Sequence, residues 1–263
     1  MSEEKKEFSF ENEEYRQTYW HTCSHIMAQA VKRLWPEVKL AIGPSIKEGW
    51  YYDMDAPFAF TPEHMAEIEA EMRKICKEKL KLERFELPRE EAIKFMEEKN
   101  EPYKVELIQD LPGDAHISFY KQGEFTDLCA GPHLDSTGRV KGNAIKLLTC
   151  NAAYWRGDSN RETLQRIYGI AFPKKDELDA YLERLEEAKR RDHRKLGREL
   201  GLFMTNDLVG KGMPMFLPKG YTVWQILENY IKEKERKLGY QHVMTPCVGT
   251  VDLYRTSGHW DHY

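Results

Sequence analysis

Between residues 15 and 35, apolar side chains recur with the spacing of one face of an α-helix. The pattern predicts a helix that ends before Pro36, because proline has no amide hydrogen with which to continue it. Two more helices are predicted, one over residues 62–80 with Thr61 as its amino-terminal cap and one over residues 88–99. The apolar stripe of the first helix consists of Cys23, Met27, Ala30, Val31 and Leu34.

Shorter apolar runs between these helices predict β-strands. One of them follows a turn-rich stretch at residues 41–49. Because strands and helices interleave, we expect an α+β domain, which we place at residues 15–172. The predicted strands are residues 50–54, 82–87, 105–108, 117–120 and 145–149.

The character of the chain changes after this domain. We predict a long helix from Asp176 to Leu200, within a linker at residues 173–201. A Gly/Pro-rich stretch follows, and then an amphipathic helix over residues 221–238. Residues 202–263 are too few for the core that this helix needs, so we expect them to be the incomplete start of a larger domain.

The chain carries 40 basic and 44 acidic residues, a net charge of −4, so it offers no global attraction to nucleic acid. Any contact with RNA must come from a local basic cluster. The predicted linker helix has one, with six cations within residues 189–198. It can lie along a phosphate backbone or form a solvated helix face, and the sequence leaves both open. The candidate tRNA-binding residues are Arg190, Arg191, Arg194 and Lys195.

The location of the protein is also constrained by its composition. No apolar run approaches the roughly 20 residues of a membrane-spanning helix. Residues 1–14 are acidic and polar, so we expect a flexible segment there and no signal peptide. The five cysteines are widely spaced and include no CxxC pair, which favours reduced thiols. We therefore expect a cytoplasmic protein.

Two segments supply the residue types of a catalytic or metal site. His21 and His25 are four positions apart on the first helix, so both imidazoles share one face, nearly opposite the apolar stripe. Cys129 and His133 flank Gly131-Pro132, which forbids a helix and indicates a loop. Together these segments provide three imidazoles and one thiol, which form either a metal set or an acid–base set.

These two chemistries differ in what they require. Three imidazole nitrogens and a sulfur would satisfy tetrahedral Zn²⁺, but a closed four-ligand site leaves no position for water. Without a metal, a neutral imidazole can accept a proton from water while a nearby cation stabilises the oxyanion. Asp127 could orient an imidazole or hold a substrate amine. The residues alone leave the choice open.

The two segments belong to a longer series in a fixed order. The whole series resembles the editing domain of bacterial threonyl-tRNA synthetases, and the resemblance covers nearly all of residues 15–263. Residues 164–169 and 191–195 resemble that family's run into its linker helix, and residues 246–260 resemble the first signature motif of a class II synthetase core. The editing-domain segments are HTCSH at 21–25, AIGP at 41–44, YYD at 51–53, YK at 103–104, DLCAGPH at 127–133 and AYWRGDSN at 153–160.

The resemblance implies a fold shared with alanyl-tRNA synthetase editing domains and an activity, hydrolysis of seryl-tRNA(Thr). We assign Lys104 to the 3′-oxygen or the oxyanion, and His21 or His133 to positioning water. Tyr52 is expected to form a pocket wall. In that family the cluster works without a metal, so we expect none, although a similar cluster in alanyl relatives holds zinc. Asp127 and Cys129 are expected to shape the serine pocket. The implied catalytic residues are His21, His25, Lys104, Asp127, Cys129 and His133.

The chain also departs from the family pattern. Many members begin with a small ubiquitin-like domain, for which the residues before Tyr15 leave no room. The later class II motifs are absent, so we do not expect this chain alone to aminoacylate. ATP, magnesium, a catalytic zinc and a homodimer are expected only of the full-length ligase. The alternatives are a zinc-dependent hydrolase that uses His21, His25, Cys129 and His133, or a non-catalytic module that binds tRNA(Thr).

Overall fold

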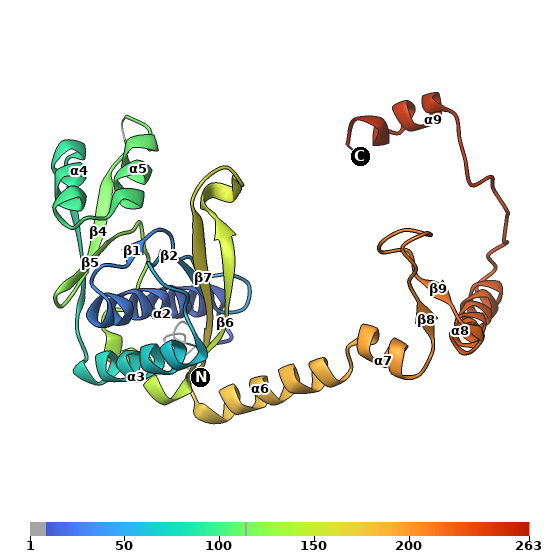
Figure 1. Ribbon diagram of the computed structural model, residues 1–263, viewed down its shortest axis with the longest axis horizontal. Coiled ribbons are helices and arrows are strands. Elements are labelled where there is room, and N and C mark those ends of the chain that lie inside the picture. The colour runs from blue at the N-terminus through green and yellow to red at the C-terminus, as the bar shows by residue number, and fades with distance from the viewer. Residues whose placement is uncertain (1–8, 114, 263) are drawn as a thin grey trace. The chain divides into compact units, whose positions relative to one another are not determined.

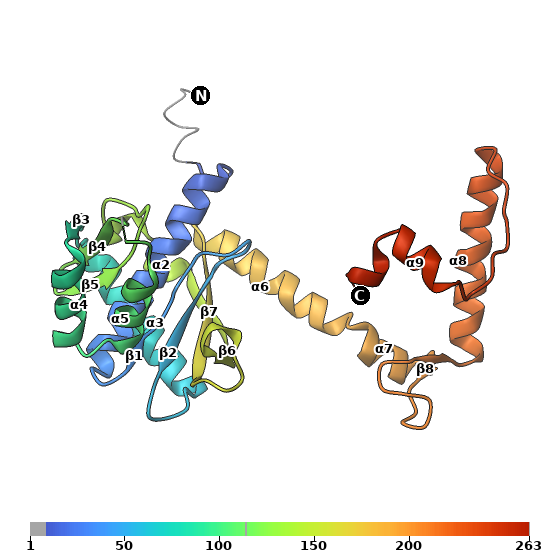
Figure 2. The same cartoon turned by 90° about the horizontal axis from the view of Figure 1, so that it is seen from above.

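The computed structural model describes residues 9–113 and 115–262. The chain forms two compact units that divide between Leu185 and Glu186, inside helix α6 (Lys175–Arg190). Figures 1 and 2 show the elements of each unit. The first unit contains helices α2 (Glu13–Leu34), α3 (Pro62–Glu78), α4 (Arg89–Glu98) and α5 (Pro102–Asp110), and strands β1 (Lys39–Leu40), β2 (Trp50–Asp55), β3 (Leu82–Leu87), β4 (Ile117–Gln122), β5 (Phe125–Leu128), β6 (Ile145–Tyr154) and β7 (Thr163–Ala171).

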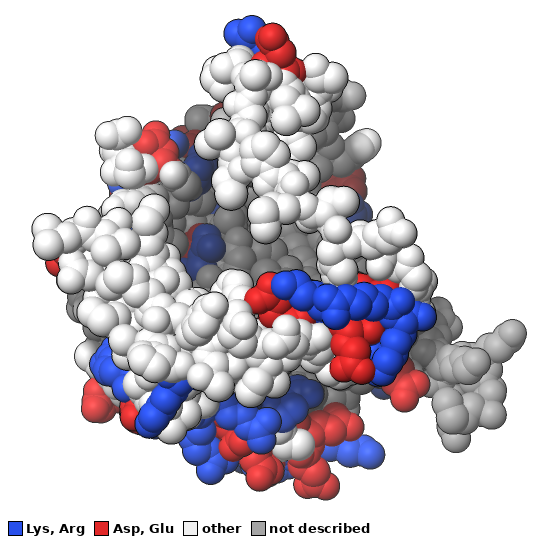
Figure 3. Space-filling view, turned by 90° about the vertical axis from the view of Figure 1, so that its right-hand side faces the viewer, with Lys and Arg blue, Asp and Glu red and all other residues white. Residues whose placement is uncertain are grey.

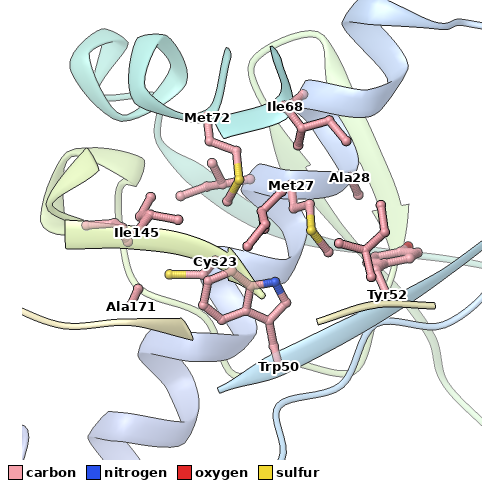
Figure 4. Packing of buried hydrophobic residues seen from close by; sticks show 14 of the residues in the cluster. Cys23, Met27, Ala28, Trp50, Tyr52, Ile68, Met72, Ile145 and Ala171 are labelled. Carbon is pink, nitrogen blue, oxygen red and sulfur yellow. The ribbon is translucent and has the colours of Figure 1, made fainter. Parts of the chain in front are cut away.

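Helix α2 forms the middle layer of the first unit. It begins after Asn12, whose side chain accepts hydrogen bonds from two amides of the first turn. The helix packs on an antiparallel sheet with the strand order β1-β2-β7-β6 and on α3. In Figure 4, Cys23 and Met27 of α2 lie between Met72 of α3 and Trp50 of β2. The main core of the unit therefore surrounds this helix.

The middle of α2 is buried on every side. The predicted apolar stripe is confirmed, since its members are fully buried apart from the partly buried Leu34. However, the expectation that the histidine face lies away from the core is wrong for His25, which is only 3% exposed. The reason is a second layer of chain: the loop after β5 covers this face, and the amide of Leu134 donates to Thr22 Oγ1 at 3.0 Å.

A smaller lobe of the first unit contains the antiparallel sheet β3-β4-β5 and helices α4 and α5. The predicted strand at residues 105–108 is wrong, because these residues belong to α5. Pro102 occupies the first turn of this helix, and Lys104 and Ile108 are buried at helical spacing. A run of four residues is too short for periodicity to separate a strand from a helix. The core of this lobe consists of Ala92, Met96, Ile108, Ile117 and Phe119.

Strands β6 and β7 form a long hairpin whose tip, residues 155–162, packs on α5. The hairpin pairs in register from Ile145 with Ala171 to Tyr154 with Thr163, with one irregularity. The buried Trp155 at its tip lies 5.1 Å from the ring of Tyr103, between ring centroids. This small apolar cluster joins the hairpin to the lobe that carries α5.

The second unit contains α7 (His193–Glu199), β8 (Phe203–Met204), β9 (Met215–Phe216), α8 (Pro218–Lys237) and α9 (Val251–Thr256). The prediction of one unbroken helix over residues 176–200 is wrong, since α6 ends at Arg190. The side chain of Asp192 caps α7 by accepting a hydrogen bond from the amide of Arg194 at 2.8 Å. The predicted amphipathic helix is confirmed as α8.

The amino-terminal residues of the described chain are held against the first unit. Residues 1–8 of the predicted flexible segment lie outside the described residues. Beyond them, Phe10 packs edge-on against Tyr19 and Trp20, with ring centroids 5.4 and 5.6 Å apart. Among the helices that the structure describes, none is long and apolar enough to cross a membrane.

Candidate active site

Three imidazoles and one thiol converge at the interface between α2 and the loop after β5. His21 and His25 come from α2, and Cys129 and His133 come from the loop. One potential ligand atom from each of the four side chains lies within 4.8 Å of the others. The rings of His21 and His25 are each 4.1 Å from the ring of His133, between centroids. Residues more than a hundred positions apart thus form one cluster.

Hydrogen bonds fix which ring nitrogens face the thiol. His21 Nδ1 lies 3.2 Å from the carbonyl oxygen of Pro132, which can only accept, so Nδ1 donates. The hydroxyl of Thr22 donates to a backbone carbonyl of α2, so His133 Nδ1 donates to Thr22 Oγ1 at 3.3 Å. In consequence, both Nε2 lone pairs point at Cys129 Sγ, at 3.4 Å from His21 and 3.2 Å from His133.

Burial keeps the cluster uncharged. It is the largest cause of the lowered pKa of His21, His25 and His133, and neighbouring imidazoles lower the pKa of His25 and His133 further. Burial also raises the pKa of the Cys129 thiol to about 12, although the amide of Gly131 donates to its sulfur at 3.2 Å. The cluster at neutral pH is therefore a set of neutral bases beside a protonated thiol.

A buried ion pair lies beside the cluster. Lys104 Nζ of α5 is 2.7 Å from Asp127 Oδ1 of β5, and it donates to the hydroxyl of Tyr52 at 3.0 Å. The Tyr52 hydroxyl in turn donates to Asp127 Oδ2 at 2.5 Å. Burial, followed by the Asp127 carboxylate, raises the pKa of Tyr52. His25 Nε2 approaches the same carboxylate oxygen at 3.7 Å and so links the ion pair to the imidazoles.

Two cavities reach this group of residues. The larger has a volume of about 930 Å³ and is lined by His21 and His133, together with Tyr15, Ser45 and Arg139. A second cavity of about 420 Å³ is lined by the carboxylate-bearing residues Asp127, Glu101 and Glu124, among others. His21 and His133 are therefore accessible from the larger cavity, whereas Asp127 borders the smaller one.

The donor set of the cluster also fits a zinc ion. In the part of the chain that the structure describes, His25 Nδ1 is one of the few buried polar side-chain atoms without a hydrogen-bond partner. Two Nε2 lone pairs and the sulfur already face one another, as ligands of a tetrahedral ion would. Such an ion would be held by His21, His25, Cys129 and His133, and it would supply Lewis acidity.

Comparison with known proteins identifies the relatives of this chain. Residues 117–168 match the family described as threonyl and alanyl tRNA synthetase second additional domain, a range that includes Asp127, Cys129 and His133. Threonine–tRNA ligase of Clostridium tetani (strain Massachusetts / E88) is 62% identical over 97% of this chain and 39% of its own length. Those of Clostridium kluyveri (strain NBRC 12016) and Acetivibrio thermocellus are each 60% identical over 97% of this chain and 40% of their own length.

The resemblance to threonyl-tRNA synthetases is confirmed. The chain spans about two fifths of the length of the threonine–tRNA ligases that it matches. The synthetase family model begins at Ile117, so it does not include Lys104, which lies on α5, or His21 and His25, which lie on α2. The structure, however, brings these residues together with the part that the family model covers.

Two residues that contact the site escaped the sequence prediction. Thr22 orients His133, and it stands between the two histidines of the HTCSH segment. Gly43 lies against the ring of Tyr52 so closely that a β-carbon there would overlap the ring. Gly43 belongs to the AIGP segment, one of the segments that resemble the synthetase family. Its place in that segment was the sequence signal that could have identified it as a residue of the site.

The candidate tRNA-binding residues lie in or next to α6 and α7, and most of them are paired with acidic neighbours. Arg190 and Arg191 contact Glu187 at 2.6 and 2.5 Å, and Arg194 contacts Asp192 at 2.7 Å. Lys195 forms no ion pair with any described residue. On the face shown in Figure 3, charged side chains of both signs likewise lie next to one another. The contact with tRNA stays a prediction.

Proposed function

We propose that the first unit hydrolyses seryl-tRNA(Thr) and that the chain is part of a threonine–tRNA ligase. The observation that carries the proposal is the juxtaposition of neutral imidazoles, two of which line a cavity, with the buried ion pair of Lys104 and Asp127. Neutral imidazoles can take a proton from water, and the ammonium can stabilise the charge that develops on oxygen. The similarity to threonine–tRNA ligases over 97% of the chain supports the choice of substrate.

The need for such an activity follows from the substrates. Serine is threonine without one methyl group, and a pocket that accepts threonine loses only about 1–3 kcal/mol of binding when that methyl is missing. Aminoacylation alone therefore discriminates poorly. A second site that admits serine and is too narrow for the threonine methyl would restore fidelity.

The reaction is the attack of water on an ester carbonyl. A histidine of the cluster, His21 or His133, would accept a proton as the water oxygen bonds to the carbonyl carbon. Collapse of the tetrahedral intermediate breaks the bond to the ribose 3′-oxygen, which takes a proton and leaves with the tRNA. Lys104 would stabilise the oxyanion or the leaving 3′-oxygen, and Asp127 and Cys129 would shape the serine pocket together with Tyr52.

We propose that the reaction proceeds without a metal and that the neutral imidazoles serve as its bases. A zinc-dependent hydrolase is the second candidate, and the unpartnered His25 Nδ1 favours it. The two differ in their response to a chelator. A third outcome, a module that binds seryl-tRNA without cleaving it, would mean that the cluster is structural.

A deacylation assay distinguishes these functions. Purified protein would be incubated with seryl-tRNA(Thr) and threonyl-tRNA(Thr), with and without chelator, and its zinc content would be measured. We expect serine to be released, threonine to be retained, and the chelator to have no effect. Lys104→Ala and His133→Ala should abolish release of serine; undiminished rates in both variants would overturn the assignment.

The remaining properties concern the whole ligase. We propose that it attaches threonine to tRNA(Thr) with ATP, magnesium and a catalytic zinc held by residues outside this chain. We further propose that it acts as a homodimer in the cytoplasm. These proposals draw on the similarity to threonine–tRNA ligases, of which this chain spans about two fifths.

A further inference from the structure

Helix α5 carries Lys104 into the candidate site, and its other side is held by the β6–β7 hairpin. Lys104 and Glu106 are two positions apart, which corresponds to roughly 200° around an α-helix. Their side chains therefore leave the helix in nearly opposite directions. Lys104 contacts Tyr52 and Asp127, whereas Glu106 contacts the hairpin tip.

Three side chains of the hairpin tip converge on the carboxylate of Glu106. Arg161 donates two parallel hydrogen bonds to it, at 2.7 and 2.8 Å, and Trp155 Nε1 donates a third at 3.1 Å. Arg156 Nε lies 3.1 Å from the same group. The hydrogen bonds from Arg161 are the main reason that the pKa of Glu106 falls to about 2, so the carboxylate is charged at neutral pH.

The hairpin tip has a demanding local conformation. Arg156 adopts φ +55° and ψ 20°, the left-handed region that residues with a β-carbon rarely enter. This conformation places Trp155 in the apolar cluster with Tyr103 and lets Arg156 reach both Glu106 and Asp110. The conformation of the tip thus allows both Trp155 and Arg156 to contact residues of α5.

Helix α5 depends on such contacts for its position. It has nine residues, and its amino-terminal cap residue Glu101 makes no side-chain capping bond. Isolated helices shorter than about 12 residues are marginal in water, so tertiary contacts must hold this one. Glu101 binds Lys32 at 2.8 Å, and the Tyr103 hydroxyl donates to Asp55 at 3.0 Å. Glu106 supplies the third anchor, to the hairpin.

We propose that Glu106 is a positioning residue for the hydrolytic reaction, which it serves by tying α5 to the hairpin tip and so fixing Lys104 against Asp127. The inference rests on the proposed function. Lys104 has to direct its ammonium at one oxygen of the substrate, and a misplacement of about 1 Å can cost about a hundredfold in rate. Loss of the Glu106 anchor therefore acts on the reaction without removing any group that touches the substrate.

The kinetic experiment compares Glu106→Gln with Glu98→Gln, a matched control that neutralises an exposed carboxylate of the neighbouring helix α4. Gln keeps the shape of Glu106 but cannot bind Arg161 as a charged pair. We expect Glu106→Gln to lower kcat for seryl-tRNA(Thr) about tenfold or more while KM changes less than about twofold. Glu106→Asp, which keeps the charge, should recover part of the rate, and Glu98→Gln should behave as the unaltered chain. Arg161→Lys should reproduce the defect from the hairpin side.

A second readout does not require the activity. Lys104 is buried, so acetic anhydride should modify it slowly in the folded protein. Digestion of the labelled protein followed by mass spectrometry of its peptides measures the rate of this modification. We expect faster modification of Lys104 in Glu106→Gln and no change in Glu98→Gln. If the unaltered chain releases no serine, the proposed function fails while this labelling still tests the anchor. The inference is overturned if Glu106→Gln keeps the parental kcat, or leaves labelling of Lys104 unchanged, or if Glu98→Gln is equally impaired.

Discussion

Lys104 Nζ lies 2.7 Å from Asp127 Oδ1, and both side chains are almost completely buried. The lysine comes from the short helix α5 and the aspartate from β5, so the pair links a helix to a sheet within the smaller lobe. Tyr52 of the main sheet bonds to both partners, which extends the link to the other layer of the unit. The charges are tolerated in this position because each has a partner of opposite sign.

Removal of one partner of this pair should destabilise the first unit strongly. Lys104→Met leaves Asp127 buried without its cation, and Asp127→Leu leaves Lys104 buried without its anion. Each should lower the free energy of unfolding by about 3–5 kcal/mol, measured by urea denaturation. The double variant should lose less than the sum of the two losses, because it leaves no unpaired charge. Additive losses would show that the two charges do not stabilise one another.

A small change at Gly43 should disturb the same group of residues. A β-carbon at this position would overlap the ring of Tyr52, whose hydroxyl bonds to Lys104 and Asp127. We expect Gly43→Ala to lower stability by about 1–3 kcal/mol, as overpacking does, and to slow release of serine. The matched control is Gly113→Ala, since a β-carbon at Gly113 would meet nothing within 4 Å. Equal effects of the two substitutions would rule out the steric explanation.

The stability of the first unit should depend on pH below pH 5 through Arg33. Its guanidinium donates to Glu78 at 2.7 and 2.8 Å and to Glu124 at 2.6 Å. These bonds are the largest cause of the lowered pKa of both carboxyls, which for Glu124 is about 2. Both pKa values lie below those of the unfolded chain, so the stabilisation is complete above about pH 4.5 and is lost as the pH falls towards 2.

Thermal unfolding at several pH values can measure this effect. The melting temperature should fall between pH 5 and pH 2.5, and Arg33→Met should reduce the size of that fall. Arg73→Met provides a comparison, because Arg73 pairs with Glu69 instead. A fall of the same size in Arg33→Met and the unaltered chain would contradict the prediction.

Binding of tRNA(Thr) tests the basic residues at α7. Lys195 has no acidic partner among the described residues, whereas Arg191 is paired with Glu187. If this segment contacts phosphate, Lys195→Gln should reduce the slope of log affinity against log salt concentration by about one. Arg191→Gln should have a smaller effect, because its charge is already compensated. Filter binding over a range of salt concentrations gives both slopes, and two unchanged slopes would indicate a solvated helix face.

The elements with unambiguous local signals were predictable from sequence. Thr61 and Pro62 mark the start of α3, and the apolar stripe of α2 is buried as its spacing indicates. The run at residues 105–108 was assigned wrongly because its four residues fit either period, and the packing of α5 against α4, the hairpin tip and β1 decides it. The break before α7 was missed because Asp192 serves as a cap within a run of good helix formers.

The candidate site was predictable in its members but not in its geometry. The HTCSH and DLCAGPH segments supplied the residue types, and the resemblance to a known family paired them. No local pattern indicates that Thr22 orients His133 or that Glu106 anchors α5, because both depend on contacts across more than forty positions of the chain. Such contacts follow from tertiary packing, which single-sequence patterns do not encode.

The enclosure of α2 has a consequence for engineering. Because His25 and Thr22 are buried, a library that varies them would lose folded protein before it altered the specificity of the proposed hydrolase. Ser45 and Asp135 border the larger cavity, and neither side chain belongs to a hydrophobic core cluster. If the proposed hydrolysis is confirmed, directed evolution of its specificity should randomise the rim of the cavity and leave the helix unchanged.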